Sequence, residues 1–145
     1  MFKHILLPTD GSELSEIVIQ KSIQFAKDIN ATVTGLHVSP EYRAFTYHAE
    51  MLEDTRDQFA EASKANAAHF LAVIEKAAKE AGVACDTVYV VNDHPYEAII
   101  KAAEQKGCDL IMMASHGRRG MQSLLIGSET QKVLTHTRIP VLVYR

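Results

Sequence analysis

The hydrophobic pattern of this chain changes period several times, and the order of these changes restricts the fold. Strand-like runs, either continuously apolar or alternating, cover residues 5–7, 32–38, 85–91, 109–113 and 139–143. Apolar residues recur at helical spacing over residues 14–29, 51–81, 96–103 and 130–134. Gly82 and Gly107 follow two of these segments and are expected to end the helices. Strands that alternate with helices predict an α/β fold, in which a parallel sheet with right-handed crossovers carries helices on both faces.

The length of 145 residues predicts one domain, residues 1–145, which can bury a core without disulfides or metal. The formal net charge of −3 gives no electrostatic reason to expect nucleic acid or an anionic membrane as a partner. The first apolar run ends at Leu7, too early for a signal peptide, and no stretch approaches the roughly 18 apolar residues of a membrane span. We therefore expect a cytoplasmic protein. Cys85 and Cys108 form no motif, so buried thiols are favoured over a metal or redox site.

A polar, glycine-bearing segment follows the fourth predicted strand. Residues 114–120 are Ala-Ser-His-Gly-Arg-Arg-Gly, and residues 124–128, Leu-Leu-Ile-Gly-Ser, lead into the last predicted helix. Glycine lets backbone N–H groups approach a ligand without a Cβ in the way. A helix that begins at Ser128 would offer unpaired N–H donors and its positive dipole end to an anion. This segment therefore predicts a phosphate cradle.

The spacing of the small residues in this segment resembles the universal stress protein family. Nucleotide-binding members of that family carry Gly-x-x-Gly, nine residues, and then Gly-Ser or Gly-Thr. Here nine residues lie between Gly117 and Gly127, Ser128 follows, and Ala114 occupies the place of the first glycine. The opening Ile-Leu-Leu-Pro-Thr-Asp-Gly-Ser and the closing Ile-Pro-Val-Leu-Val are also typical of the family, so the likeness covers the whole chain.

The resemblance implies a five-stranded parallel sheet of strand order 3-2-1-4-5 with helices on both faces, of the adenine nucleotide alpha hydrolase-like type. In this order the first and fourth strands are neighbours at the centre, where the direction of winding reverses. Ligands of open α/β sheets bind outside the strand ends at such a switch point. The polar loops 8–12 and 114–117, which follow these two strands, are therefore expected to line one crevice.

We predict that this crevice binds an adenine nucleotide, namely ATP, with Mg²⁺ accompanying it. Asp10 and Val38 would define the nucleoside end, and the backbone of residues 114–117 and 127–130 would hold the phosphates. The predicted binding residues are Pro8, Thr9, Asp10, Val38, Met113, Ala114, His116, Gly117, Arg118, Gly127, Ser128, Glu129 and Thr130. No catalytic residue and no metal-ligating side chain is predicted, since the chain lacks the P-loop, dinucleotide-binding and nucleophile-elbow motifs.

Two of these polar residues also have the spacing of helix caps. Asp10 precedes Glu13, and Ser128 precedes Gln131, as in capping boxes. The Asp10 carboxylate therefore either caps the first helix or contacts the ribose, the base edge or a phosphate-bound Mg²⁺. The Ser128 cap and a phosphate site are compatible at one helix terminus. Glu129 suits the first helical turn, but it would repel phosphate and is expected to point away from the crevice.

Other loop residues keep two interpretations. Arg118 and Arg119 could clamp a polyphosphate through bidentate hydrogen bonds, or they could form a solvated loop tip. His116 matches the family's loop histidine and is expected to pack or hydrogen-bond beside the ligand rather than act as a base. His37 resembles the adenine-side wall of the family. Ala114 either narrows the pocket by one methyl group or shifts the loop.

The predicted role is that of a regulatory binder in the stress response, because fixed amides favour binding but nothing evident activates a water. Three alternatives stay open: a slow ATPase or autophosphorylating enzyme, a nucleotide-free dimeric member that binds partner proteins, and a binder of another small polar ligand such as a cyclic nucleotide or AMP. The resemblance also implies a homodimer through residues 139–143. The loop 39–50, with Tyr42, Phe45 and Tyr47, is either a lid over the base or a packed connector.

Overall fold

The computed structural model describes residues 1–42, 49–116 and 126–145; in the helix that begins at Ala49, side chains are described from residue 55 onward. The strands in these ranges are β1 (His4–Pro8), β2 (Thr32–Ser39), β3 (Cys85–Val91), β4 (Leu110–Ala114) and β5 (Val141–Tyr144). The helices are α1 (Glu13–Ile29), α2 (Ala49–Ala81), α3 (Pro95–Lys106) and α4 (Ser128–His136). Strands and helices alternate along the chain, which confirms the predicted fold class.

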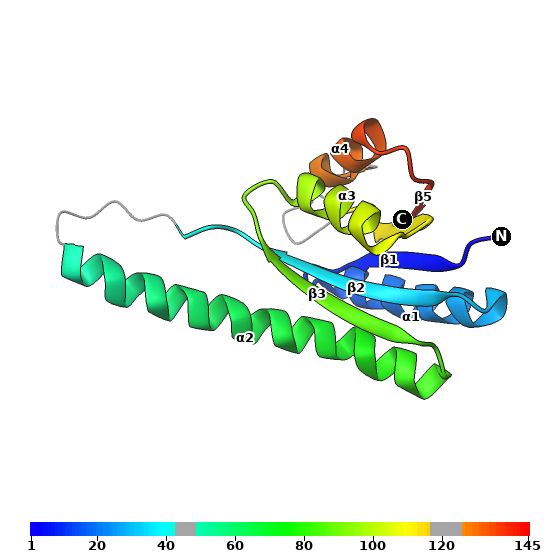
Figure 1. Cartoon of the computed structure of the whole chain (residues 1–145), viewed down its shortest axis with the longest axis horizontal. Helices are drawn as coiled ribbons and strands as arrows, with labels where there is room; N and C mark the ends of the chain where they lie inside the picture. Colours follow the sequence, from blue (N-terminus) through cyan, green and yellow to red (C-terminus); the bar gives the residue numbers. More distant parts are fainter. Residues whose placement is uncertain (43–48, 117–125) are drawn as a thin grey trace.

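The five strands form one sheet in the order β3-β2-β1-β4-β5, and every pairing is parallel. This confirms the predicted order 3-2-1-4-5. Helices α1 and α2 cover one face of the sheet, and α3 and α4 cover the other (Figure 1). The central strand β1 therefore has a helical layer on each side and is paired on both edges.

Two apolar layers lie on the two faces of the sheet. Ile5 and Leu7 of β1 pack toward α1 and α2, whereas Leu6 between them packs toward α3 and α4. All three side chains are fully buried. Burial of a side chain of this size stabilises a protein by about 1.5–3 kcal/mol. A strand covered on both faces needs apolar residues at successive positions, which explains the continuous run seen in the sequence.

The pairing of β1 with β4 is held at its amino end by one carboxylate. Asp109, just before β4, accepts the N–H of Lys3 at 2.9 and 3.1 Å and the N–H of His4 at 3.0 Å. Partial burial acts to raise the pKa of Asp109, but the hydrogen bonds from the His4 and Lys3 amides outweigh it and hold the pKa below its usual value. The ionised carboxylate therefore joins two segments that are far apart in the sequence.

Several element boundaries differ from the predictions. Helix α2 begins at Ala49 rather than Met51, so the predicted loop 39–50 is shorter at both ends. Strand β4 begins after Asp109, whose side chain is engaged with the start of β1. Strand β5 begins at Val141 rather than Ile139, because Pro140 has no N–H to donate to a neighbouring strand. Gly82 and Gly107 end α2 and α3 in left-handed conformation, as predicted.

The two cysteines are free thiols. Cys108 is buried in the layer beneath α3, and burial raises the pKa of its thiol to about 11. Burial, together with the nearby Asp86 carboxylate, likewise raises the pKa of Cys85 to about 11. Both thiols are therefore protonated at neutral pH; Cys108 is buried as predicted, whereas Cys85 is only half-buried.

Within the ranges that the structure describes, no helix combines the length and the apolar character needed to cross a membrane.

Two buried serines on α1 provide a test of the packing. The Ser15 hydroxyl donates to Thr9 Oγ1 at 2.9 Å, whereas the Ser22 hydroxyl has no hydrogen-bond partner among the described residues. We expect Ser22→Ala to raise the free energy of unfolding by about 0.5–1 kcal/mol, since it removes a buried, unsatisfied polar group. The matched variant Ser15→Ala should lower it by about 1 kcal/mol. Urea denaturation measures both, and equal losses of stability would contradict this account.

Candidate functional site

The loop after β1 is built around Thr9, which is only 6% exposed. Its N–H donates to Leu36 O at 2.8 Å, and its Oγ1 accepts the N–H of Gly11 at 3.2 Å. Oδ1 of the next residue, Asp10, accepts the N–H of Ser12 at 2.9 Å. A carboxylate that bonds a backbone amide two residues ahead closes a tight local turn. The loop is therefore held in one conformation by bonds to its own backbone and to β2.

The N-cap of α1 is Ser12, which excludes the helix cap as one of the two roles left open for Asp10. Ser12 Oγ accepts the N–H of Ser15 at 3.2 Å, and the backbone of Ser12 is extended. Asp10 stands two residues too early in the chain to cap this helix, and its side chain closes the preceding turn instead. The structure thus places Asp10 in the loop at the carboxyl end of β1.

The start of α4 is tied to the end of β4. The N–H of Gly127 donates to Ser115 O at 2.6 Å, and Thr130 Oγ1 donates to Ala114 O at 3.0 Å. A Cβ added to Gly127 would lie 3.1 Å from Ser115 O, so glycine allows this close approach of two backbone segments. The helix terminus is therefore positioned beside the β4 loop, as predicted.

The N-cap of α4 is Gly127 rather than Ser128, so the predicted Ser128 cap is wrong. Ser128 is the first helical residue, and its side chain is exposed. Gln131 Nε2 reaches back to Ile126 O at 3.3 Å, one residue before the cap. The backbone N–H groups of the first turn, other than that of Gly127, remain the candidates for an anion at this terminus.

Glu129 in the first turn of α4 directs its carboxylate toward α3. Its Oε2 accepts the N–H of Tyr96 at 3.0 Å, and its Oε1 pairs with Lys132 Nζ at 3.3 Å. An acidic side chain at the beginning of α3 is favourable, because that terminus carries a partial positive charge. The Glu129 carboxylate therefore contacts α3, away from the predicted crevice, as expected.

Other predicted residues lie at the same edge of the sheet. Pro8 ends β1, Met113 is buried near the end of β4, and Val38 near the end of β2 packs toward the layer of α3. His116 follows β4, and its Nδ1 lies 2.7 Å from the Oγ of the fully buried Ser115. Gly117 and Arg118, like Arg119, Phe45 and Tyr47, lie outside the described residues.

The sequence pattern predicts no role for Phe70 of α2 in the candidate site. Its ring lies beneath Gly11, which has a φ of +77°, and a Cβ added to Gly11 would collide with that ring. The ring also meets the imidazole of His37 edge-on, with 5.1 Å between the centroids. Hydrophobic spacing places Phe70 on the buried stripe of a helix but says nothing about which loop it supports.

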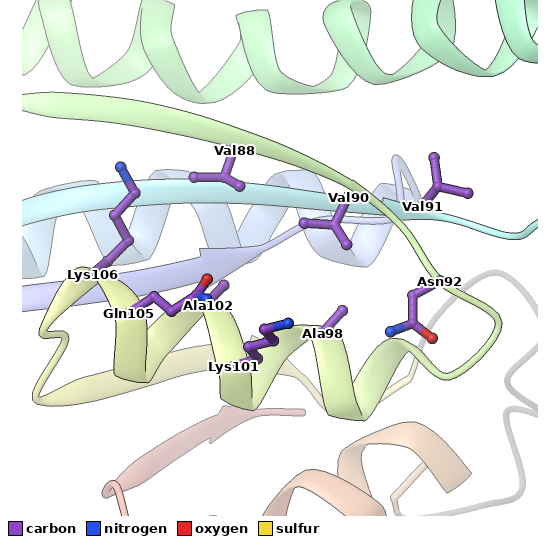
Figure 2. Close-up of a pocket in the computed structure, with 9 residues that line it drawn as sticks. All are labelled: Val88, Val90, Val91, Asn92, Ala98, Lys101, Ala102, Gln105 and Lys106. Carbon is purple, nitrogen blue, oxygen red and sulfur yellow. The ribbon is translucent and has the colours of Figure 1, made fainter.

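Two hollows among the described residues lie away from the carboxyl ends of β1 and β4. One, of about 280 Å³, lies between β3 and α3, where Val88 and Val90 project toward Ala98 and Ala102 (Figure 2). The other, of about 410 Å³, lies between α2 and the ends of β2 and β3. Neither is lined by a predicted site residue. The candidate site is therefore assigned from the sheet topology, which brings the loops after β1 and β4 to the same edge, and not from either hollow.

The fold is that of an open α/β protein, in which β1 and β4, each followed by a polar residue of the candidate site, are neighbours at the switch point of a five-stranded parallel sheet. The model of the Universal stress protein family matches residues 1–145. The chain belongs to the universal stress protein family.

Curated relatives of similar length support this assignment. The chain is 31% identical to universal stress protein MJ0577 of Methanocaldococcus jannaschii, over 100% of this chain and 96% of that protein. It is 30% identical to universal stress protein YxiE of Bacillus subtilis, over the full length of both. The solved structure of MJ0577 superposes with a TM-score of 0.83 and 32% identity, covering 99% of this chain and 95% of that one.

Two further solved structures share the fold and contain nucleotides. A universal stress protein of Archaeoglobus fulgidus in complex with dAMP has a TM-score of 0.67 and 15% identity, covering 100% of this chain and 98% of that one. A universal stress protein in complex with cAMP has a TM-score of 0.64 and 20% identity, covering 99% and 96%. At these identities the likeness concerns the fold.

Gly11 provides a test of the loop that carries Asp10. Gly11 and Gly82 have nearly the same positive φ, +77° and +73°, but only Gly11 has a ring against its missing Cβ. Either alanine variant should lose about 1 kcal/mol of stability from the left-handed conformation. Gly11→Ala should lose at least a further 1 kcal/mol from the collision with Phe70. Thermal unfolding compares the two variants, and equal losses would contradict the close contact.

Proposed function

We propose that this universal stress protein binds an adenine nucleotide, ATP together with Mg²⁺, at the carboxyl ends of β1 and β4. Residues 1–145 act in this proposal as one domain that works in the cytoplasm as a regulatory binder in the stress response. One observation carries the proposal. Strands β1 and β4 are parallel neighbours, so Asp10 after β1 and Ser115 and His116 after β4 follow the carboxyl ends of adjacent strands, at the switch point of the sheet.

The residues at this edge fit the two ends of a nucleotide. The first-turn amides of α4, from Ser128 to Thr130, and the loop after Ala114 would hold the phosphates. The N–H of Gly127 is already engaged with Ser115 O, so Gly127 contributes by letting the backbones approach closely. Val38 would offer its backbone to the base edge. When bound, Mg²⁺ would neutralise part of the phosphate charge.

Asp10 is the acidic side chain of the β1 loop in this site. One of its oxygens accepts the Ser12 amide, which orients the carboxylate within the loop. A carboxylate is an acceptor with two oxygens, so it can bond a ribose hydroxyl or approach a phosphate-bound cation. We therefore assign Asp10 to the nucleoside side of the crevice or to the cation.

Binding is favoured over catalysis by the environment of the adjacent Ser115 and His116. The Ser115 hydroxyl is fully buried and lies against His116 Nδ1, so it is not presented to a phosphate as a nucleophile. Fixed amides at a helix terminus stabilise a bound anion whether or not it reacts. A slow ATPase remains the alternative function if the site does catalyse a reaction. The dAMP and cAMP complexes of proteins with this fold favour a test of monophosphates beside ATP.

Calorimetric titration of nucleotide-stripped protein tests the proposal. We expect micromolar binding of ATP with Mg²⁺, loss of binding in Gly117→Val, and at least roughly tenfold weaker binding in Asp10→Ala. The matched control is Glu13→Ala, which removes an exposed acid three residues after Asp10 and should bind like the wild type. No binding of ATP, AMP or cAMP up to millimolar concentration would overturn the proposal in favour of a nucleotide-free, partner-binding member.

We also propose a two-fold homodimer through the β5 edge of the sheet. All four residues of β5 are half-buried, and uncovered edge strands invite pairing. Lys21 Nζ of α1 lies 5.6 Å from the centre of the Tyr144 ring, which places this face of α1 beside β5. One turn earlier on α1, Ile17 is 50% exposed. An apolar side chain beside the outer edge of the edge strand β5 fits a second copy of this chain.

Light scattering at micromolar concentration tests the dimer. We expect the mass of a dimer for the wild type and a shift toward the monomer for Ile17→Glu, because a charge would be buried in the interface. The matched control is Val91→Glu, which changes a residue of equal exposure (51%) on the opposite edge strand and should stay dimeric. A monomeric wild type would exclude this interface.

A further inference from the structure

His37 of β2 makes a hydrogen bond that joins the sheet to the loop carrying Asp10. Its Nδ1 lies 2.8 Å from the carbonyl oxygen of Thr9, and the side chain is 8% exposed. A carbonyl oxygen only accepts, so Nδ1 carries the proton and donates. The buried imidazole thus forms a hydrogen bond within the protein, to the backbone of the loop after β1.

The ring of His37 contacts two aromatic side chains. Phe70 of α2 meets it edge-on at 5.1 Å between centroids, and Tyr89, its register partner on β3, lies nearly parallel to it at 6.4 Å. Because protein interiors are closely packed, a buried ring with two such neighbours has little freedom to turn. The donor on Nδ1 is therefore presented to Thr9 in a fixed direction.

The acceptor of this hydrogen bond belongs to the peptide unit that leads into Asp10. The carbonyl of Thr9 and the N–H of Asp10 lie in one planar group, so fixing the carbonyl also fixes the start of Asp10. Thr9 is also bonded through its N–H to Leu36 O, at 2.8 Å. Two adjacent residues of β2, Leu36 and His37, therefore hold both backbone polar groups of Thr9.

We propose that His37 is a positioning residue for Asp10: its Nδ1–H fixes the Thr9–Asp10 peptide and thereby aims the Asp10 carboxylate into the nucleotide crevice. This role rests on the proposed function for its ligand and on the hydrogen bonds of Thr9 and Asp10 for its mechanism. His37 itself does not touch the nucleotide. It acts through Thr9, and the rings of Phe70 and Tyr89 keep it in place.

Two substitutions separate the hydrogen bond from the packing. His37→Phe keeps an aromatic ring in contact with Phe70 and Tyr89 but removes the donor, whereas His37→Asn keeps an N–H near the position of Nδ1. We expect His37→Phe to weaken ATP binding about tenfold and His37→Asn to restore most of the affinity. The control is His69→Phe, because His69 also contacts the Phe70 ring, at 5.9 Å, but is exposed on the outer side of α2.

A double-mutant cycle with Asp10 tests whether the effect passes through that carboxylate. If His37 acts by aiming Asp10, His37→Phe should have no further effect on ATP affinity in the Asp10→Ala background. Wild-type affinity in His37→Phe, or losses that simply multiply in the double variant, would overturn the proposal. Each variant is compared at a temperature where circular dichroism shows it fully folded.

A measurement without nucleotide separates this proposal from the proposed function. The Ser12 amide donates to Asp10 Oδ1, so its hydrogen exchange reports whether the carboxylate keeps its position. Exchange should be roughly threefold faster or more in His37→Phe and near the wild-type rate in His37→Asn. If the wild type binds no nucleotide, the proposed function fails, yet the exchange comparison still decides the role of His37: equal rates in all variants would overturn it.

Discussion

The parallel pairing of β1 with β4 is the contact on which the geometry of this protein depends. It joins segments separated by about a hundred residues, and loop closure over such a distance costs conformational entropy that local structure cannot recover. The apolar residues of both strands, buried between two helical layers, supply the compensating free energy. Asp109 adds hydrogen bonds to the backbone of Lys3 and His4 at one end of the pair. Without this pairing the two polar loops would not share an edge of the sheet.

The described residues at that edge are fixed by hydrogen bonds to neighbouring elements. Thr9 is bonded to Leu36 and His37 of β2. At the start of α4, Gly127 and Thr130 are bonded to Ser115 and Ala114 at the end of β4. A preorganised site loses less conformational freedom on binding, so more of the contact energy appears as affinity.

Much of this arrangement could be predicted from the sequence, because it depends on patterns that are local. The continuous apolar run at residues 5–7 indicates a strand covered on both faces, and glycines mark the ends of α2 and α3. The strand order came from the resemblance to a family, since alternation alone leaves the order open. Capping-box spacing is satisfied one or two residues from the true caps, which are Ser12 and Gly127, so it does not locate them. Phe70 packs against Gly11, but the two residues belong to no common sequence motif, so only the tertiary structure reveals this contact.

Ala114 shows how a departure from the family's glycine pattern can be interpreted physically. It is the last residue of β4, pairs with Tyr144 of β5 and has extended backbone, so its conformation does not require glycine. Its carbonyl accepts the Thr130 hydroxyl, which helps to fix the start of α4. The methyl group is therefore neutral for the fold, and any effect must arise from how closely a ligand can approach this backbone. In the proposed site, the methyl group would therefore act on how closely a nucleotide phosphate approaches the end of β4.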